Sequence, residues 1–187
     1  VASAVLKRGA RIINDVSGLR DDPELARVVR DYGAGLVLVH RRGNPETMQS
    51  LASYGDVVEE VLLELSQSME TACSYGVLAE QIVLDPGIGF SKTADQSLEL
   101  INRLDEFKTL GRPILIGPSR KSFLGAVLSG GPADRLFGTL AASTLAFARG
   151  ADILRVHDVK AIREALLVAE AILGAKQKAA LSKQVVG

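Results

Sequence analysis

The sequence has little of several residue types that particular functions require. Its 187 residues include one cysteine, two histidines, no tryptophan and only 4% aromatic residues, and the formal net charge is zero. Without a positive field or an aromatic stacking surface, the chain lacks the usual means of binding nucleic acid. Its histidines and cysteine are too few for an ordinary structural zinc site. The lone Cys73 cannot form an internal disulfide, which indicates a reducing compartment and predicts a cytoplasmic protein.

Long apolar segments are also absent from the sequence. No apolar run approaches the roughly 20 residues of a membrane span, so we expect no contact with the membrane interior. The first residue is valine, and no signal peptide is visible. Residues 1–9 read as the last turns of a helix stopped by Gly9. We therefore expect a sequence that begins partway through a domain.

Five short apolar runs, each ending in polar residues, dominate what is present. They occupy residues 11–15, 36–40, 82–86, 114–119 and 153–157. Each run is short enough to be a strand buried on both faces, and each is followed by a loop and a helical pattern. Five repeats of this order predict an α/β fold with a parallel sheet. With 47% hydrophobic residues, the chain is long enough for one domain and too short for two.

The helical patterns have recognisable starts and faces. The segment 54–75 carries an apolar stripe that includes Ala72 and Cys73, so we expect Cys73 in the core. Thr93 and Gln96 have the spacing of a capping box at the start of the next helix. Further helices are expected over 133–149 and 159–174, the second ending at Gly174. The segment 175–187 then forms a tail that we expect to fray.

Two parallel architectures fit five β/α units. An eight-stranded (β/α)8 barrel typically needs about 250 residues, so this chain would supply five of its eight units. An open doubly wound sheet of five strands is the alternative. The helical pattern at residues 1–9 favours the barrel, because a complete open sheet rarely begins inside a crossover. We therefore predict one partial barrel domain over residues 1–187.

In a parallel barrel the carboxyl ends of the strands carry the active site, so the polar ends of the five runs describe it. They are rich in cations and hydrogen-bonding groups: Asn14, His40, Asp85, Ser119, Lys121, Arg155 and His157. Hydroxyls and cations at 119–122 suit an anion, and strand alternation places Arg155 and His157 on one face.

Each of these residues also has a structural alternative. The 119–122 segment could be a solvated basic turn, and Arg155 could form a salt bridge with Asp85. Asn14 and Asp85 are also common in turns that end strands. His40 could be a packed, hydrogen-bonded histidine in the core.

Six segments together resemble the dihydropteroate synthases, a family of pterin-binding (β/α)8 barrels. The segments are IINDVSG at 12–18, HRRGNPETMQ at 40–49, LDPGIGF at 84–90, GPSRKSFLG at 117–125, RLFGTLAA at 135–142 and GADILRVHD at 150–158. They occur in the family's order and extend over the chain to about residue 174. The resemblance implies that this chain corresponds to strands four to eight of the barrel.

The resemblance also implies a reaction of folate biosynthesis. A 6-hydroxymethyl-7,8-dihydropterin diphosphate condenses with p-aminobenzoate, giving 7,8-dihydropteroate and diphosphate. The matching positions assign Asn14, Asp85 and Lys121 to the pterin, with Gly117 also at the substrate site. Phe90 would lie near the aminobenzoate. The catalytic set implied by the family is Lys121, Arg155, His157 and Asp85.

The remaining substrate groups also find matching positions. Ser119 would face the aminobenzoate carboxylate, while Arg155 and His157 would hold the leaving diphosphate. Fixed cations around a leaving diphosphate help most in the transition state, where negative charge develops.

Two departures from the family pattern limit these implications. Arg41 stands where the family usually has an apolar residue lining the pterin pocket. The family's first three β/α units have no counterpart here, including the unit that binds Mg²⁺, so this chain offers no assignable metal ligand. We therefore expect the 187 residues alone to be inactive. The family further implies a homodimer formed through 133–149 and 159–174.

Two other functions remain open from the sequence. A methyltetrahydrofolate-dependent corrinoid methyltransferase shares the pterin barrel, but it has no diphosphate for cations such as Arg155 to hold. A non-catalytic half-barrel that serves binding or assembly is the third possibility. The intact site residues argue against degeneration, whereas the unmatched strands argue for it.

Overall fold

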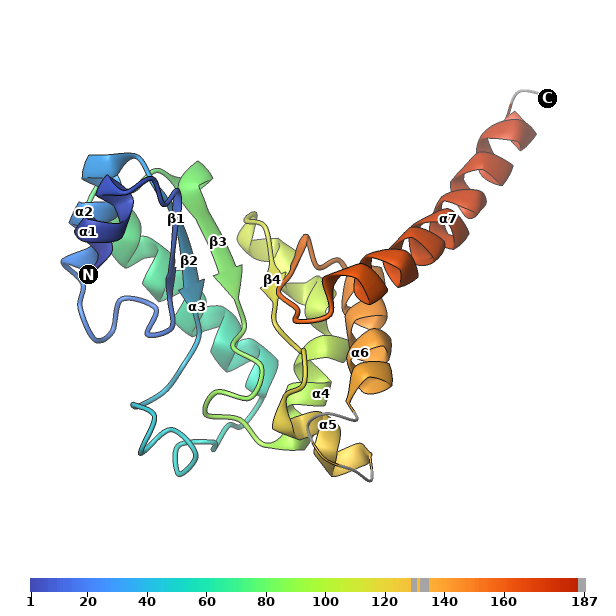
Figure 1. Ribbon diagram of the computed structural model, residues 1–187, viewed down its shortest axis with the longest axis horizontal. Helices are drawn as coiled ribbons and strands as arrows, with labels where there is room; N and C mark the ends of the chain where they lie inside the picture. Colours follow the sequence, from blue (N-terminus) through green and yellow to red (C-terminus); the bar gives the residue numbers. More distant parts are fainter. Residues whose placement is uncertain (129–130, 132–134, 185–187) are drawn as a thin grey trace.

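Five parallel strands form the centre of the computed structural model, which describes residues 1–128, 131 and 135–184 (Figure 1). Three strands form one sheet in the order β1 (Ile12–Asp15), β2 (Gly35–Val39), β3 (Ile82–Asp85). Two shorter strands, β4 (Leu115–Ile116) and β5 (Ile153–Leu154), form a second parallel pair. A single parallel bridge between Leu84 and Ile114 joins β3 to β4. The predicted parallel strands in sequence order are confirmed.

Helices follow each strand, as the sequence predicts. They are α1 (Ala2–Lys7), α2 (Leu25–Tyr32), α3 (Val57–Ser74), η1 (Ala79–Gln81), α4 (Ala94–Asn102), η2 (Leu104–Leu110), α5 (Ser122–Val127), α6 (Leu136–Ala148) and α7 (Val159–Gln184). The capping box is confirmed: Gln96 N donates to Thr93 Oγ1 at 3.2 Å, and Thr93 N donates to Gln96 Oε1 at 2.9 Å. Helix α7 continues through Gly174, where the sequence predicted its end.

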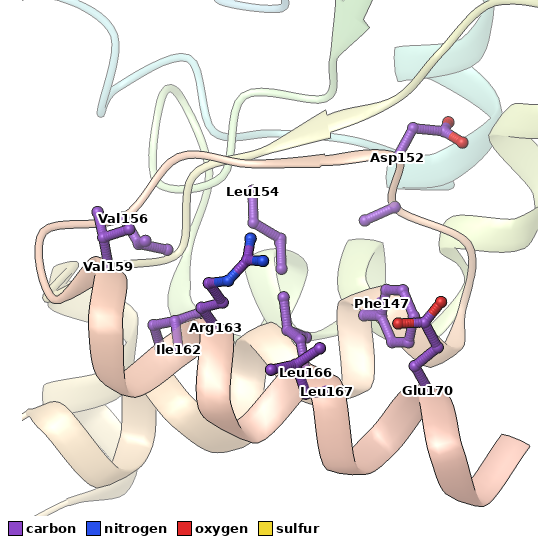
Figure 2. Close-up of a pocket in the computed structure, with 11 residues that line it drawn as sticks. Phe147, Asp152, Leu154, Val156, Val159, Ile162, Arg163, Leu166, Leu167 and Glu170 are labelled. Carbon is purple, nitrogen blue, oxygen red and sulfur yellow. The ribbon is translucent and has the colours of Figure 1, made fainter.

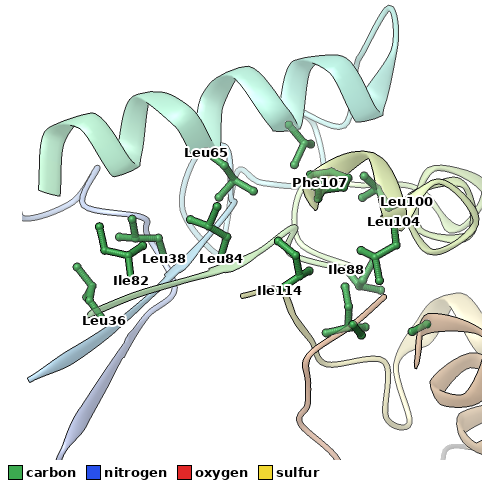
Figure 3. Packing of buried hydrophobic residues seen from close by; sticks show 14 of the residues in the cluster. Leu36, Leu38, Leu65, Ile82, Leu84, Ile88, Leu100, Leu104, Phe107 and Ile114 are labelled. Atoms are coloured by element: carbon green, nitrogen blue, oxygen red, sulfur yellow. The ribbon is translucent and has the colours of Figure 1, made fainter. Parts of the chain in front are cut away.

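The main core lies between the three-stranded sheet and α3. Alternate strand residues, Leu36 and Leu38 on β2 with Leu84 on β3, point toward Leu65 of α3, and Phe107 extends this cluster along the chain (Figure 3). The other face of β2 presents Val37 and Val39 to Leu115, Val83 and Phe90. Because successive strand side chains point to opposite faces, β2 is buried on both sides, as expected of an inner barrel strand.

The prediction that each strand is buried on both faces is wrong for the two outermost strands. Ile12 of β1 is 61% exposed and Ile153 of β5 is 39% exposed. Each of these strands has a neighbour on only one side among the described residues, so nothing described covers its outer edge. The strand period alone could not distinguish an inner strand from an outer one.

The expectation of a core position for Cys73 is also wrong. Cys73 is exposed on the last turn of α3, while its neighbour Ala72 is fully buried. Adjacent helix residues differ by about 100° in direction, so only one of the pair faces the sheet. None of the described helices is long and apolar enough to cross a membrane.

Candidate functional site

Parallel strands bring three of the predicted polar residues into direct contact. Arg155 follows β5, and its Nη1 donates to Asn14 Oδ1 at the opposite side of the sheet, 2.7 Å away. Its Nη2 approaches Asp85 Oδ2 at the end of β3, 3.5 Å away. The salt bridge between Arg155 and Asp85, which was one structural alternative for Arg155, is therefore present. It is long, however, and the Arg155 side chain is 44% exposed. The guanidinium thus keeps an open face toward solvent.

The backbone at Gly117 permits this position of Arg155. A Cβ added at Gly117 would lie 3.0 Å from Arg155 Nη2 and 3.2 Å from its Nε. The guanidinium therefore lies directly over the Gly117 backbone, and any side chain there would crowd it. Gly117 takes part in the site by leaving room for Arg155.

Asp85 is the buried acceptor of the cluster. It is 1% exposed, and its Oδ1 accepts a hydrogen bond from Gly87 N at 2.8 Å. Burial raises the pKa of Asp85, while Lys121, Arg155 and Lys92 act in the opposite direction through their charges. The site therefore holds one desolvated carboxyl group surrounded by three cations.

Lys121 forms a second wall of the site with the loop that follows β3. Its Nζ donates to the carbonyl oxygen of Ile88 and lies 4.6 Å from the centre of the Phe90 ring. Burial lowers the pKa of Lys121, the charge of Arg155 lowers it further, and Asp85 raises it. Lys121 and Phe90 thus lie together beyond the carboxyl ends of the strands, next to the Asp85 cluster.

Ser119 and His157 tie the loops after β4 and β5 together. Ser119 Oγ and His157 Nδ1 lie 2.9 Å apart, and the His157 backbone N donates to the same Oγ at 3.2 Å. Ser119 Oγ thus contacts both the backbone and the ring of His157 and holds that ring beside the loop after β4. In the described part of the chain, His157 is not hydrogen-bonded to Lys121 or Arg155. Its link to the anion-binding candidates runs through Ser119.

Arg41 does not join this cluster. Its Nη2 donates to Asp21 Oδ2 at 2.6 Å, and the whole residue is buried. The Arg41 carbonyl accepts from Arg20 Nη1 at 2.6 Å. Arg41, the residue that departs from the family pattern, is therefore held by Asp21 and Arg20, away from the Asn14–Arg155–Asp85 cluster.

Sequence reasoning missed Lys92, which is buried close to Asp85. Lys92 is 3% exposed, and its Nζ contacts His40 Nδ1 at 2.8 Å and donates to the Phe90 carbonyl at 3.0 Å. His40 Nε2 in turn lies 2.9 Å from Glu64 Oε2 on α3. His40 is therefore a packed, hydrogen-bonded histidine, as one reading of the sequence proposed. The available signal for Lys92 was its place in the loop after Asp85.

Burial sets the protonation of these two residues. It lowers the pKa of His40 from its usual 6.5 to about 4, so the imidazole is neutral at neutral pH. It also lowers the pKa of Lys92 from 10.5 to about 7, although Asp85 and Glu64 favour the charged form. Burial opposes ionisation of Glu64, but hydrogen bonds from His40, Arg42 and Arg20 hold its pKa well below the usual range.

The described residues do not fit a magnesium site. Nowhere in residues 1–128, 131 and 135–184 do three His, Cys, Asp or Glu side chains gather in a group that could hold a metal ion. Asp85 is the one carboxylate of the polar cluster, and its neighbours are cations that oppose metal binding. No step of the chemistry is therefore assigned to a metal bound by this chain.

Known proteins similar to this chain form a consistent group. Residues 1–157 match the protein family described as pterin binding enzyme. A dihydropteroate synthase from Synechocystis is 49% identical over 173 residues, which cover 92% of this chain and 60% of that protein. The Escherichia coli K12 dihydropteroate synthase is 42% identical over 171 residues, covering 91% of this chain and 60% of its own. The chain thus spans about 60% of the length of these curated relatives.

Solved structures lead to the same family. Thermus thermophilus dihydropteroate synthase in complex with 4-aminobenzoate is 43% identical with a TM-score of 0.86, covering 92% of this chain and 70% of that one. The same enzyme in complex with 6HMPPP gives a TM-score of 0.88 and 43% identity, covering 92% and 68%. This chain therefore belongs to the pterin-binding enzyme family, and to the dihydropteroate synthases within it.

Proposed function

We propose that this chain supplies strands four to eight of a (β/α)8 barrel that acts as a dihydropteroate synthase. In this reaction the amine of p-aminobenzoate attacks the exocyclic carbon of a dihydropterin diphosphate. A carbon–nitrogen bond forms, the carbon–oxygen bond to diphosphate breaks, and the amine loses one proton. The observation that carries the proposal is the Asn14–Arg155–Asp85 cluster with Lys121 beside it. Similarity to structures containing 4-aminobenzoate and 6HMPPP supports the substrate class.

Each group in the cluster has a chemical task in this proposal. Asp85 and Asn14 offer a buried carboxylate and an amide, which match the donors and acceptors along a pterin edge. Lys121 and Phe90 form the adjoining wall, against which the aminobenzoate would pack. Ser119 would face the carboxylate of that substrate. All of these groups come from the carboxyl ends of parallel strands, where barrel enzymes carry their chemistry.

Arg155 and His157 would receive the leaving diphosphate. Arg155 has an open face toward solvent, and the exposed His157 ring is held in place by Ser119. Donors placed where negative charge develops lower the barrier more than they strengthen substrate binding. This concentration of cations disfavours the corrinoid methyltransferase alternative, whose reaction releases no diphosphate.

We propose Mg²⁺ as a cofactor of the complete barrel on the strength of the family resemblance alone. The ligand in the family lies in the first strand, which has no counterpart in this sequence. We also propose a cytoplasmic location, which the single cysteine supports because Cys73 has no partner within the chain for a disulfide.

A homodimer through 133–149 and 159–174 is supported by apolar side chains exposed on α6 and α7. They include Phe137, Leu145, Leu167, Val168 and Ile172. Beside them lies a hollow of about 420 Å³, in which Phe147 of α6 and Leu166 of α7 line one wall (Figure 2). Exposed large apolar side chains grouped on neighbouring helices are typical of interfaces. Residues 133 and 134 lie outside the described residues.

The test compares the 187-residue chain with a chimera in which the first three β/α units of the Synechocystis relative precede it. We expect the chimera to form dihydropteroate from the pterin diphosphate and p-aminobenzoate, and the chain alone to form none. Asp85→Asn should abolish this activity, while the matched exposed variant Asp105→Asn should retain it. A folded chimera that binds no pterin would overturn the proposed function. Full activity of the 19.8 kDa chain as a monomer would overturn the partial barrel.

A further inference from the structure

A hydrogen-bonded chain of three polar side chains lies near Asp85, and the proposed reaction does not use it. Lys92 Nζ contacts His40 Nδ1 at 2.8 Å, and His40 Nε2 lies 2.9 Å from Glu64 Oε2. Lys92 and His40 are almost fully buried, while Glu64 remains partly exposed. Buried ionisable groups are costly, so such a chain calls for a reason at the site it supports.

The hydrogen-bond directions in this chain are determined by its end members. Ionised Glu64 can only accept, so the neutral His40 places its single proton on Nε2. Nδ1 then carries the lone pair and accepts from Lys92. Arg42 and Arg20 hold the Glu64 carboxylate in place, with Arg42 Nε at 2.8 Å from Oε1. Lys92 is thus fixed by two acceptors, His40 Nδ1 and the Phe90 carbonyl.

In space, Gly87 lies between the Lys92 and Asp85 side chains. Gly87 N donates to Asp85 Oδ1 at 2.8 Å, and a Cβ on Gly87 would lie 3.4 Å from Lys92 Nζ. The same Cβ would lie 1.9 Å from the His40 carbonyl oxygen, and Gly87 has a φ of +73°, so only glycine fits there. The His40 backbone N donates to the Asp85 carbonyl at 2.8 Å. The ammonium and the carboxylate therefore flank the same residue.

We propose that Lys92 is a positioning residue: its amino group, held by His40 and Glu64, keeps the 87–90 loop in place for the pterin and adds to the charges that act on Asp85. The inference rests on the proposed function, because it takes Asp85 as the pterin acceptor. Burial alone favours a protonated Asp85, which would have one acceptor oxygen fewer to offer. The charges of Lys121 and Arg155 also favour the Asp85 carboxylate, and Lys92 adds to them from the buried side of Gly87.

Several other charged or titratable groups act on Lys92 and must be considered in any titration. They are His40 and Arg42 after β2, Tyr54 in the following loop, Glu64 on α3, Asp85 on β3 and Lys121 before α5. Asp85 and Glu64 favour the ammonium, whereas Lys121 and Arg42 oppose it. The experiment therefore follows Asp85 itself.

The pKa of Asp85 is measured by carboxyl ¹³C NMR in the full chain and in Lys92→Met, which keeps the length of the side chain without its charge. Lys7→Met on the exposed surface of α1 is the matched control. We expect Lys92→Met to raise the pKa of Asp85 and, in the chimera, to weaken binding of 6-hydroxymethylpterin diphosphate roughly tenfold at neutral pH. The control should leave both values unchanged.

A measurement on the unmodified chain keeps the inference testable if Lys92→Met does not fold. Imidazole ¹⁵N NMR should show His40 protonated on Nε2 and unprotonated on Nδ1 between pH 5 and 8. A proton on Nδ1 would overturn the inference, because Lys92 would then have no acceptor there.

The outcomes separate this inference from the proposed function. If the unmodified chimera binds no pterin, the proposed function fails, while the carboxyl titration still decides whether Lys92 acts on Asp85. An unchanged Asp85 pKa in folded Lys92→Met overturns the inference even when the chimera is active. A raised pKa with unchanged pterin affinity overturns the role of Lys92 in binding.

Discussion

The two parts of the sheet differ in how completely they are buried. In the β1–β2–β3 part, the inner strands β2 and β3 are covered by α3, and almost all their side chains are inaccessible. In the β4–β5 part, the strands are only two residues long, and β5 keeps 39% of Ile153 exposed. Exposed apolar side chains on α6 and α7 surround this second part. One core cluster runs through both parts, while the exposed apolar side chains lie on the outer strands β1 and β5 and on α6 and α7.

The polar residues of the site also differ in burial, although Asn14 on β1 is exposed and Ser119 after β4 is buried. Asp85, His40 and Lys92 belong to the first part and are almost fully buried with fixed partners. Arg155 follows β5 and is half exposed, although it reaches across to Asn14 on β1. An acceptor for a heterocycle, such as Asp85, can therefore be held in place within the buried core. A cation that receives a departing anion needs an open face.

The largest expected difference between the two parts is in the free energy of unfolding. Leu84→Ala in β3 should lower the free energy of unfolding by about 4 kcal/mol, because it removes a fully buried side chain beside Leu38 and Ile114. Ile153→Ala in β5 should cost less than about 1 kcal/mol, since that side chain is partly exposed already. Chemical denaturation of both variants measures the two values. Equal losses would mean that the partly exposed Ile153 contributes as much to stability as a fully buried strand residue.

Acid should act mainly on the buried part. The pKa of His40 falls from 6.5 to about 4 on folding, so between these values the unfolded chain binds the proton and the folded chain does not. Stability is therefore fully present above pH 6.5 and should fall by roughly 3 kcal/mol as the pH approaches 4. Denaturation curves across this window provide the measurement.

His40→Asn is the matched variant for this window, because an asparagine there has no titrating group. Its stability should vary much less between pH 6.5 and 4, whatever its absolute value. Lys92 affects stability in a different pH range, because its pKa is about 7 in the folded chain and 10.5 in the unfolded chain. An unchanged slope in His40→Asn would show that a group whose pKa is lowered on folding, such as Glu64, governs the acid response.

Local patterns predicted much of the fold and the polar cluster. Period, strand length and capping residues identified the five strands and the start of α4, because these depend on neighbours in sequence. The rule that strand ends converge brought Asn14, Asp85 and Arg155 together correctly.

The rest depended on contacts that no local pattern contains. Lys92 is buried by His40, which lies 52 residues earlier, and its charge is stabilised from another strand. Ala72 and Cys73 look equivalent in a stripe, yet one helical step separates buried from exposed. The exposure of Ile12 and Ile153 depends on what lies beside the outer strands, which the period of a strand does not state.

The open part of the site should respond in turnover more than in affinity. In the chimera, Arg155→Ala should lower kcat roughly a hundredfold, about 2.7 kcal/mol, because a donor to the developing diphosphate charge is lost. Binding of the pterin diphosphate should weaken much less, since Asp85 and Asn14 remain. Steady-state kinetics with calorimetric binding separates the two effects. Equal losses in both would place Arg155 with the preformed acceptors instead.

The smallest expected effect concerns the helix that joins the two parts of the sheet. Thr93 accepts from Gln96 N at the start of α4, and Gln96 returns a bond to Thr93 N. Thr93→Ala should therefore cost about 1 kcal/mol of unfolding free energy, because the Gln96 backbone N at the helix start loses its acceptor. Thr109→Ala is the matched control, since Thr109 is exposed and bonds only the Glu106 carbonyl within η2. A cost for Thr93→Ala no larger than the control's would mean that packing of α4 against α3 and α6 alone keeps the two parts together.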